Sequence, residues 1–487
     1  MIGPQQRKLR RLADGGTPRL LELCSGCGGM SLGFHRAGYT LSAHVESDPT
    51  AVATFAENFA PSAAHAIWSR PLDMTTRSPA DVVELFEPGA KPSDAFDVLA
   101  AGLPCQAFAR IGRSKLRSIS GDDRAFKNDP RATLYRRFLE YVRLTAPLAI
   151  VLENVPDILN FGGHNVPEEI SHTLADLGYD SGYTLLNAAF FGVPQIRERL
   201  FLIAVHRSLG AAVAFPRPTH HASLPRGYEG SRRVALKHVP PDSRYFHPIS
   251  EPSNALPEAI AARAALSDLP FISEPWSDPR AMRRRRVSER LAYRSVTAPT
   301  AYSTLMREWP GFREYADTDG HVVRLTPRDF PIFRDMPHGA DYPRALEVAE
   351  ALFEARLQAL GLRLRPDSEE HHELRKAMIP PYDPSKFPNK WWKLDPDLPV
   401  RTLTAHMGKD TYSHIHYDGR QRRTISVREA ARLQSFPDGF RFCGQMNAAF
   451  RQIGNAVPPL LALAVARKLL STLRRSALAA TAHAQTA

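Results

Sequence analysis

Between residues 20 and 205 the chain alternates short apolar runs with longer stretches of helical periodicity. The clearest apolar runs lie at 20–23, 98–101, 149–152 and 200–205. Runs this short and this uniformly apolar are typical of strands buried on both faces of a parallel sheet. Because helical patterns such as 134–144 and 170–177 lie between the runs, the sequence predicts a doubly wound α/β sheet of parallel strands.

The rest of the chain indicates a second domain. At 487 residues the chain exceeds the size at which a single core stops growing. From about residue 206 to residue 400, proline and arginine become frequent and apolar periodicity weakens. Helices are predicted again at 427–434 and 458–473, the second opened by prolines in its first turn. We expect the two ends, 1–17 and 474–487, to be flexible tails.

Charge and hydropathy narrow the class of protein. The formal net charge of +12 suits a polyanionic partner, although many basic proteins bind no nucleic acid. The four consecutive arginines Arg283, Arg284, Arg285 and Arg286 indicate either a solvated face or a contact with phosphates. No apolar run approaches the length needed to cross a bilayer, and the basic N-terminus lacks the apolar stretch of a signal peptide. We therefore expect a cytoplasmic protein.

The four cysteines, Cys24, Cys27, Cys105 and Cys443, are too few to staple a chain of this size, so we expect reduced thiols. Cys24 and Cys27 form a Cys-x-x-Cys pair, which is one half of many zinc sites. The sequence has no second Cys-x-x-Cys or Cys-x-x-His, and both residues lie in a glycine-rich loop. We therefore predict no metal site.

The glycine-rich loop follows the first apolar run and precedes a helical pattern that reaches Ala37. Its glycines, among them Gly26, Gly28 and Gly29, let the backbone approach a ligand without a Cβ in the way. Glu46 follows twenty residues after Gly26, at the predicted end of the next strand, which is the spacing of a carboxylate that binds ribose hydroxyls. Neither the Gly-x-Gly-x-x-Gly pattern nor Gly-Lys-Ser/Thr is present, which favours a ribose-bearing ligand without pyrophosphate. S-adenosylmethionine is the commonest such cofactor.

Cys105 lies in the loop Gly-Leu-Pro-Cys-Gln at 102–106, directly after the apolar strand at 97–101. The carboxyl end of a parallel strand faces the crevice in which sheets of this kind bind ligands. An isolated cysteine is more often a buried structural residue. That interpretation is less attractive in a loop shaped by glycine and proline at this edge, so Cys105 is the candidate nucleophile.

Three further polar residues are predicted at the same edge. Glu153 ends the strand at 149–152 and is either a helix cap or an acid whose pKa is raised by burial. Arg197 and Arg199 are two residues apart, so in an extended segment both guanidinium groups point to one side.

Six blocks in this order resemble the DNA cytosine-5 methyltransferases, bacterial type, over about residues 18–473. The blocks are the glycine loop, Pro104-Cys105-Gln106, Glu153-Asn154-Val155, the Gln-x-Arg-x-Arg segment at 195–199, and the segments 428–437 and 452–459. The family resemblance implies a Rossmann-like S-adenosylmethionine-dependent methyltransferase sheet with an inserted, smaller, irregular target-recognition domain. Glu22, Cys24 and Ala109 depart from the family pattern, which usually has Asp, Phe and Ser there; none of these changes removes a reacting group.

The resemblance implies a covalent mechanism. Cys105 would add to C6 of a cytosine flipped out of duplex DNA, which makes C5 nucleophilic toward the sulfonium methyl. Glu153 would protonate or hydrogen-bond N3, while Arg197 and Arg199 would hold O2 and the loop. Loss of the C5 proton and elimination of Cys105 would then release 5-methylcytosine.

The resemblance also assigns binding residues and domains. The cofactor residues would be Cys24, Ser25, Gly26, Gly28, Gly29, Glu46, Asp73, Met74, Pro104, Asn455 and Val457. The candidate DNA contacts are Gln106, Arg283, Arg284, Arg285 and Arg286. The catalytic domain would comprise 18–270 and 391–473, with target recognition at 271–390. We expect a monomer in the bacterial cytosol, bound to the nucleoid through DNA, without a membrane or metal, acting in restriction-modification or phage defence beside cognate proteins encoded nearby.

Three other classes compete with this interpretation. A cytosine-5 methyltransferase that acts on transfer RNA would share the catalytic motifs, but such proteins have a short recognition segment, whereas the middle of this chain spans nearly two hundred residues. A catalytically silent DNA-binding regulator is disfavoured because Cys105, Glu153, Arg197 and Arg199 are all present. An oxidoreductase would require nicotinamide binding, which the glycine pattern does not favour.

Overall fold

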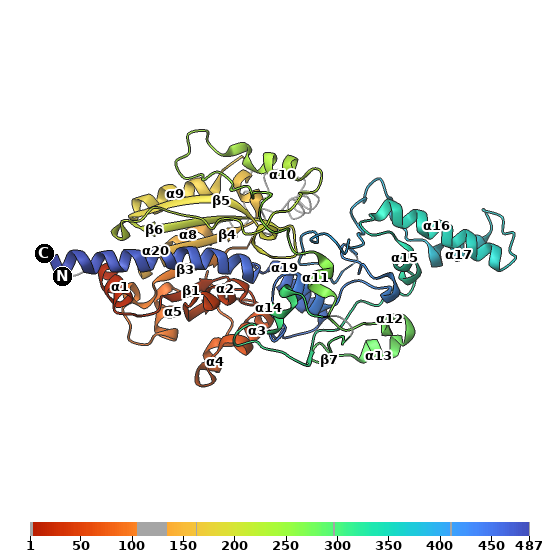
Figure 1. Cartoon of the computed structure of the whole chain (residues 1–487), viewed down its shortest axis with the longest axis horizontal. Helices are drawn as coiled ribbons and strands as arrows, with labels where there is room; N and C mark the ends of the chain where they lie inside the picture. Colours follow the sequence, from red (N-terminus) through yellow and green to blue (C-terminus); the bar gives the residue numbers. More distant parts are fainter. Residues whose placement is uncertain (1–2, 105–133, 162, 296–297, 410–411, 487) are drawn as a thin grey trace. The chain divides into compact units, whose positions relative to one another are not determined.

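The computed structural model describes residues 3–104, 134–161, 163–295, 298–409 and 412–486 (Figure 1). Cys105, Gln106 and Ala109 therefore lie outside the described residues. The chain divides into two compact units. The first comprises Met1–Ala259 with Ala456–Ala487, and the second comprises Ile260–Asn455. Each unit is described separately below.

The first unit contains a six-stranded mixed sheet with the order β2-β1-β3-β4-β6-β5. Its strands are β1 (Arg19–Leu23), β2 (Thr40–Val45), β3 (Val98–Gly102), β4 (Ala149–Asn154), β5 (Tyr179–Asn187) and β6 (Glu198–His206). The first four strands pair in parallel, which confirms the predicted core of an α/β sheet. Their carboxyl ends therefore meet at one edge, where the candidate site residues follow.

The expectation that the run at 200–205 is a parallel strand is wrong, because β6 pairs antiparallel with both β4 and β5. The strand β5, which precedes it, was not predicted. Only residues 188–197 connect β5 to β6. A parallel connection needs a crossover of about a dozen residues or more, so a link this short permits only antiparallel pairing.

Helices cover both faces of the sheet. Successive residues of β1, such as Leu20 and Leu21, lie in two different apolar clusters because successive side chains of a strand point to opposite faces of the sheet. One cluster packs against α5 (Pro79–Phe86), α8 (Leu134–Thr145) and α9 (Val166–Asp176); the other packs against α1 (Pro4–Ala13), α2 (Gly29–Ala37) and α20 (Pro459–Thr486). Among the described residues of this unit, the other α-helices are α3 (Pro49–Phe59), α4 (His65–Trp68), α6 (Pro92–Ala95) and α10 (Tyr228–Ala235).

The expected flexible tails are instead largely helical. In α1, Leu9 is buried in the apolar cluster, and Lys8 Nζ donates to the carbonyls of Thr145 and Ala146, both at 2.9 Å. At the other end α20 continues to Thr486, and Ala477 is buried in the same cluster. Figure 1 shows α20 running along the sheet beside α1 and α2. Apolar packing therefore holds α1 and the part of α20 up to Ala477 against the sheet.

The helical stretch Met446–Ala480 is long and apolar enough to cross a bilayer, which the expectation of no such run overlooked. Within its apolar window, 72% of the residues are buried inside the protein. Burial of this extent is typical of a core helix in a soluble protein, because a membrane helix presents its apolar surface to lipid.

The second unit is largely irregular. Its elements are α11 (Ala262–Leu266), α12 (Glu274–Ser277), α13 (Pro279–Arg284), β7 (Leu291–Ala292), α14 (Ala301–Arg307), β8 (Asp317–Thr318), α15 (Phe330–Asp335), α16 (Tyr342–Ala359), α17 (Glu369–Met378), α18 (Val427–Leu433) and α19 (Met446–Asn455). The helices predicted at 427–434 and 458–473 are confirmed as α18 and α20. An apolar core around Phe333, Tyr342 and Trp391 joins α15 and α16 to the segment that follows α17.

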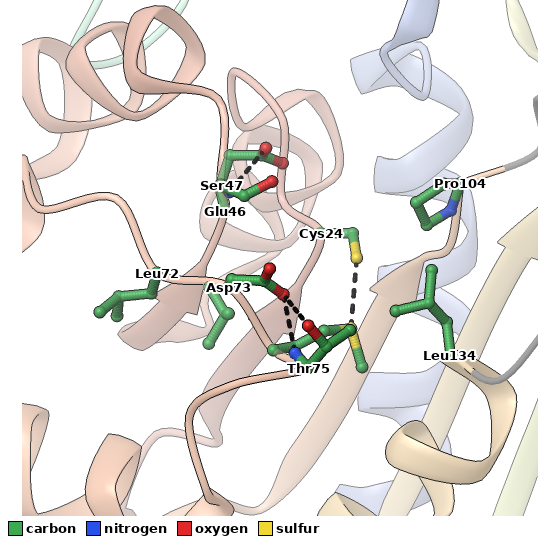
Figure 2. A pocket seen from close by; sticks show the side chains of 10 residues that line it. Cys24, Glu46, Ser47, Leu72, Asp73, Thr75, Pro104 and Leu134 are labelled. Carbon is green, nitrogen blue, oxygen red and sulfur yellow. Dashed lines mark hydrogen bonds between the residues drawn. The ribbon is translucent and has the colours of Figure 1, made fainter. Parts of the chain in front are cut away.

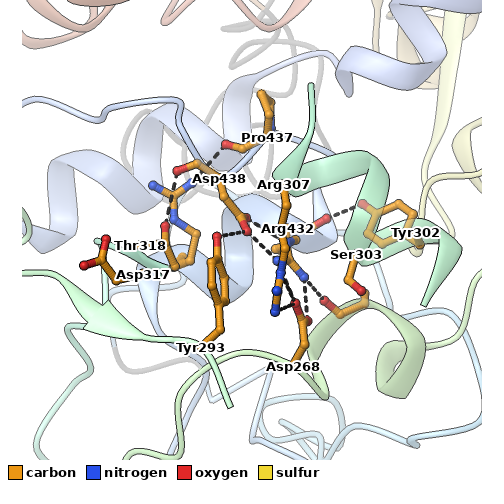
Figure 3. A network of polar contacts seen from close by, with 12 residues as sticks. Asp268, Tyr293, Tyr302, Ser303, Arg307, Asp317, Thr318, Arg432, Pro437 and Asp438 are labelled. Carbon is orange, nitrogen blue, oxygen red and sulfur yellow. Dashed lines mark hydrogen bonds and ion pairs between the residues drawn. The ribbon is translucent and has the colours of Figure 1, made fainter. Parts of the chain in front are cut away.

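The second unit is wider than the range 271–390 expected for target recognition. Buried ion pairs explain why the flanking segments belong to it (Figure 3). Arg432 of α18 binds Asp268, at 2.9 Å, and also Asp438, and all three side chains are almost fully buried. These contacts join the segment after α11 to α18, although the two are far apart in the sequence.

Candidate cofactor and catalytic site

The glycine loop is held in a shape that glycine favours. Gly28, at the N-terminus of α2, has a φ of 92°, and a Cβ there would lie 2.5 Å from Phe59 and 3.0 Å from Phe55. Cys24 also has a left-handed backbone, with a φ of 51°, although it has a side chain. Such strain in a residue other than glycine is typical of functional sites. The surrounding structure therefore holds the loop in a backbone conformation that residues other than glycine rarely adopt.

Glu46 follows β2 and is fixed by backbone groups. Its carboxylate accepts hydrogen bonds from the N–H groups of Gly26 at 2.9 Å, Ser47 at 2.8 Å and Asp48 at 2.8 Å. An ionised carboxylate has about four acceptor positions, so three bonds leave capacity for one further donor. Glu46 therefore ties the glycine loop to the end of β2 and can still bind a ligand hydroxyl.

A cavity of about 290 Å³ lies beside this carboxylate (Figure 2). Its lining contains five of the residues expected to bind cofactor, namely Cys24, Glu46, Asp73, Met74 and Pro104. The other lining residues are Val45, Ser47, Leu72, Thr75 and Leu134. A pocket with apolar walls and two carboxylates is suited to a small ligand that has both a flat ring and polar hydroxyl or amino groups.

Asp73 and Cys24 are oriented by their neighbours across this cavity. The Asp73 carboxylate accepts hydrogen bonds from the Thr75 N–H at 2.8 Å and from the Thr75 hydroxyl at 2.7 Å. The Cys24 thiol lies 3.4 Å from the sulfur of Met74 (Figure 2). Burial raises the pKa of Cys24, so this thiol stays protonated and is a polarisable wall rather than a nucleophile.

Other expected cofactor residues do not line the cavity. Ser25, Gly28 and Gly29 are buried in the loop behind it. Val457 is 5% exposed and packs in the apolar cluster beneath α20. Asn455 ends α19 and belongs to the second unit.

His44 is a positioning residue that the sequence did not indicate. Its imidazole stacks on Phe55, with ring centroids 3.9 Å apart, and its Nε2 donates to the Trp68 carbonyl at 2.8 Å. Burial lowers the pKa of His44 to about 4, so the ring is neutral and its Nδ1 accepts the Ser25 hydroxyl at 3.1 Å. The ring thereby fixes the glycine loop from below. In the sequence, the position of this histidine within the otherwise largely apolar run of β2 is the feature that could have indicated a supporting role.

The predicted acid Glu153 lies on β4, where it pairs in register with Gly102 of β3. The Glu153 side chain is buried, and its Oε1 lies 3.1 Å from Arg199 Nε. Burial raises the pKa of Glu153, while Arg199 and Arg197 act against that rise. Arg197 is itself buried and donates to the Ala456 carbonyl at 3.3 Å. Glu153 and Arg199 therefore meet beside the strand that leads toward Pro104.

The arginine run has two kinds of members. Arg283, Arg284 and Arg286 are exposed. Arg285 is directed inward and binds Glu274 at 2.6 Å and Glu289 at 3.3 Å, with 7% of its side chain exposed. Arg285 is thus used inside the second unit, because both of its carboxylate partners are local.

Glu22 is a buried acid on β1. In the sequence it stands out as the one carboxylate within the apolar run at 20–23. Its carboxyl group accepts a hydrogen bond from the Ser31 hydroxyl. Burial raises the pKa of Glu22 from 4.5 to about 8. The folded state therefore binds more protons than the unfolded state between these values, so this group stabilises the fold most at low pH and its contribution is lost as the pH rises toward 8.

Glu22→Gln is expected to flatten the decline in stability between pH 6 and 8.5, because the amide stays neutral throughout. From pH 6 to pH 8.5 the variant should lose about 2–3 kcal/mol less free energy of unfolding than the parent, since the parent declines over about two pH units of about 1.4 kcal/mol each. Urea unfolding at both pH values measures this. The exposed Glu57 on α3, changed to Gln, is the matched control. Equal pH slopes for Glu22→Gln and the parent would contradict the assignment.

The chain is similar to known proteins over nearly its whole length. A family model described as C-5 cytosine-specific DNA methylase matches residues 19–471. The chain is 36% identical to the "Putative type II methyltransferase M.OihORF3336P" of Oceanobacillus iheyensis, over 94% of this chain and 96% of that protein. It is 29% identical to the type II methyltransferase M.AgeI of Thalassovita gelatinovora, over 93% and 99%.

Among solved structures, a putative DNA modification methyltransferase encoded within an E. coli prophage is similar, with a TM-score of 0.58. Its sequence identity is 21%, and the match covers 94% of this chain and 99% of that one. At this identity the likeness concerns the fold, and it confirms the predicted α/β architecture.

Proposed function

Because the chain belongs to the C-5 cytosine-specific DNA methylase family, we propose that it transfers a methyl group from S-adenosylmethionine to C5 of a cytosine flipped out of double-stranded DNA. The observation that supports this most is the joint position of two features at one edge of the sheet. The cavity beside Glu46 ends at Pro104, and Glu153 lies in register with Gly102 on the neighbouring strand. A ligand cavity and a buried acid thus flank the loop that leads to Cys105.

The residues around the cavity suit S-adenosylmethionine. Glu46 would accept a hydrogen bond from one ribose hydroxyl, and Asp73 would accept one from the adenine amino group. Leu72, Met74 and Pro104 offer apolar contacts for the ring. The bound cofactor would supply an electrophilic methyl on its sulfonium. Gly26, where a Cβ would meet no atom within 4 Å, leaves the loop backbone beside Glu46 open for the remainder of the molecule.

Glu46→Gln is expected to weaken cofactor binding by about 10- to 100-fold, because one lost charge-assisted hydrogen bond is worth about 1.5–3 kcal/mol. The amide nitrogen also cannot accept from the N–H groups that anchor the carboxylate. Calorimetric titration with S-adenosylmethionine measures the loss. Glu57→Gln, on the surface of the same unit, should bind like the parent; equal affinity of both variants would exclude Glu46 from the site.

Cys105, in its thiolate form, would add to C6 of the flipped cytosine and form a carbon–sulfur bond. Glu153 would give N3 a proton, a role that needs the neutral acid and therefore fits the raised pKa of this buried group. C5 would then take the methyl group. Water would take the C5 proton, the bond between Cys105 and C6 would break to restore the thiolate, and N3 would return its proton to the Glu153 carboxylate. Arg199, 3.1 Å from Glu153, would orient the carboxyl group.

The second unit would contain the target-recognition domain, within the range 271–390 proposed from the sequence. The exposed Arg283, Arg284 and Arg286 are proposed contacts to the DNA backbone, together with Gln106 near the flipped base. Similar proteins are named type II methyltransferases, which supports a role in restriction-modification beside a nuclease of the same specificity. We propose that the enzyme acts as a monomer on DNA in the cytoplasm.

Transfer of tritiated methyl groups to duplex DNA and to transfer RNA tests the proposed substrate. Label in DNA that co-migrates with 5-methylcytosine after hydrolysis is the expected result. Label in RNA alone would favour the transfer-RNA enzyme instead. Bisulfite sequencing of DNA from cells that express the protein would then identify the target sequence.

A further inference from the structure

A second hollow, of about 680 Å³, lies wholly within the second unit. Three arginines, Arg263, Arg294 and Arg420, line it. They come from α11, from the segment after β7, and from the turn at Gly419–Gln421. Tyr417 and the hydroxyl residues Ser267 and Thr300 also line it. Three cationic side chains from separate segments thus converge on one concave surface.

The charge of this hollow is not balanced internally. Arg263 pairs with Asp397 at 3.2 Å and Arg420 with Asp418 at 2.7 Å, and both aspartates line the hollow. In the part of the chain that the structure describes, no carboxylate forms an ion pair with Arg294. The ion pair between Arg263 and Asp397 is largely exposed, with 57% and 75% of the two side chains accessible to solvent. Exposed pairs of this kind are weak and can exchange for a better anion.

Aromatic rings hold the arginines in place. Phe271 lies near two of them, with the guanidinium carbons of Arg294 and Arg420 at 6.0 Å and 5.8 Å from its ring centroid. The guanidinium carbon of Arg263 lies 5.9 Å from the ring centroid of Tyr417. Contacts at this distance restrict a guanidinium group without using its N–H donors. The donors of Arg294 therefore remain available to a ligand.

We propose that this hollow binds a backbone phosphate of the substrate DNA, with Arg294 as the principal contact. The inference rests on the proposed function, because it takes DNA as the substrate. A guanidinium fork matches the oxygens of a phosphate diester, and backbone contacts position a protein on duplex DNA without reading its sequence. The hollow thereby adds a DNA contact outside the pocket for the reacting base, at residues that the arginine run did not include.

Binding of Arg294→Gln to a fluorescent duplex, followed by anisotropy at several salt concentrations, tests this proposal. Loss of one phosphate contact is expected to lower the slope of log affinity against log salt by about 1, and to weaken binding several-fold at low salt. Arg313→Gln is the matched control, because Arg313 is an exposed arginine of the same unit outside the hollow and loses the same charge. Its slope should change less.

A second variant and a second ligand make the result decisive. Arg420→Gln, at a largely exposed position, should reproduce the loss if Arg294→Gln fails to fold. Calorimetry with sodium phosphate in the absence of DNA distinguishes a site for free phosphate. The DNA assignment is overturned if the variants match Arg313→Gln in salt slope, or if they lose only phosphate binding. Methylation of duplex DNA by the parent protein separates this failure from failure of the proposed function.

Discussion

Replacing Cys105 by alanine is expected to abolish methyl transfer to DNA while leaving DNA binding largely intact. C5 of cytosine is a poor nucleophile, and the proposed route makes it reactive only after a thiolate has added to C6. Alanine removes that nucleophile but little volume and no charge. Tritiated methyl transfer measures the activity, and anisotropy with a labelled duplex measures binding. The parent and the variant should therefore differ in the first measurement and not in the second.

Cys443→Ala is the matched control, since Cys443 is a cysteine of the second unit and loses the same thiol. It should methylate DNA like the parent. A duplex that contains 5-fluorocytosine adds a direct readout. Release of Cys105 requires that C5 lose a proton, and fluorine in the place of that proton cannot leave, so the bond between Cys105 and C6 would persist. The parent should then form a denaturant-stable protein–DNA adduct. Methylation by Cys105→Ala, or an adduct at that variant, would remove Cys105 from the proposed role.

The predicted parallel strands were recoverable from the sequence because burial on both faces leaves a direct mark on composition. The runs at 20–23, 98–101 and 149–152 became β1, β3 and β4 with small changes at their ends. The spacing between Gly26 and Glu46 was also informative, and the structure joins these two residues by a hydrogen bond of 2.9 Å. Local patterns sufficed here because each element is specified by neighbours in the sequence.

Strand direction and chain ends were not recoverable in this way. An apolar run such as 200–205 is equally apolar in either direction, and the short link from β5 decides its orientation. The ends of the chain are ordered by contacts with distant residues, as when Lys8 binds the carbonyls that end α8. Such contacts leave little periodicity in a tail of mixed composition.

The charged residues proposed for the site stand out in the sequence, whereas the residues that support them do not. Glu46 directly follows β2 and Glu153 lies near the end of β4, and both positions can be read from the apolar strand pattern. His44 and Glu22 lie inside strands and act by holding the glycine loop and the start of α2, so their roles depend on partners such as Ser25 and Ser31. A single buried polar residue in an apolar run marks such a support, but its partner is visible only in the fold.

The largest effect on stability is expected from Arg432→Met in the second unit (Figure 3). The Arg432 side chain is fully buried and donates to Asp438 at 2.7 Å, to Asp268 at 2.9 Å and to the Ala265 carbonyl at 2.8 Å. Methionine has a similar length but no donor, so the buried Asp438 loses its ion-pair partner and keeps the Tyr293 hydroxyl, whereas Asp268 keeps its ion pair with Arg307. Removal of one partner from a buried ion pair costs about 3–5 kcal/mol. Urea unfolding, followed by tryptophan fluorescence, should show a loss of this size in the second unit.

The pH dependence of Arg432→Met distinguishes this cause from a simple packing defect. In the parent protein Arg432 is the main group that lowers the pKa of Asp438 against the effect of burial. Asp438 therefore stabilises the parent above its ordinary titration range, and this contribution is lost as the pH falls. Without Arg432, burial favours the neutral acid, so the deficit of the variant should shrink from pH 7 to pH 5. Arg313→Met, at an exposed position, should unfold like the parent at both values. A deficit that does not change with pH would mean that lost packing, and not the unpaired Asp438 carboxylate, destabilises the variant.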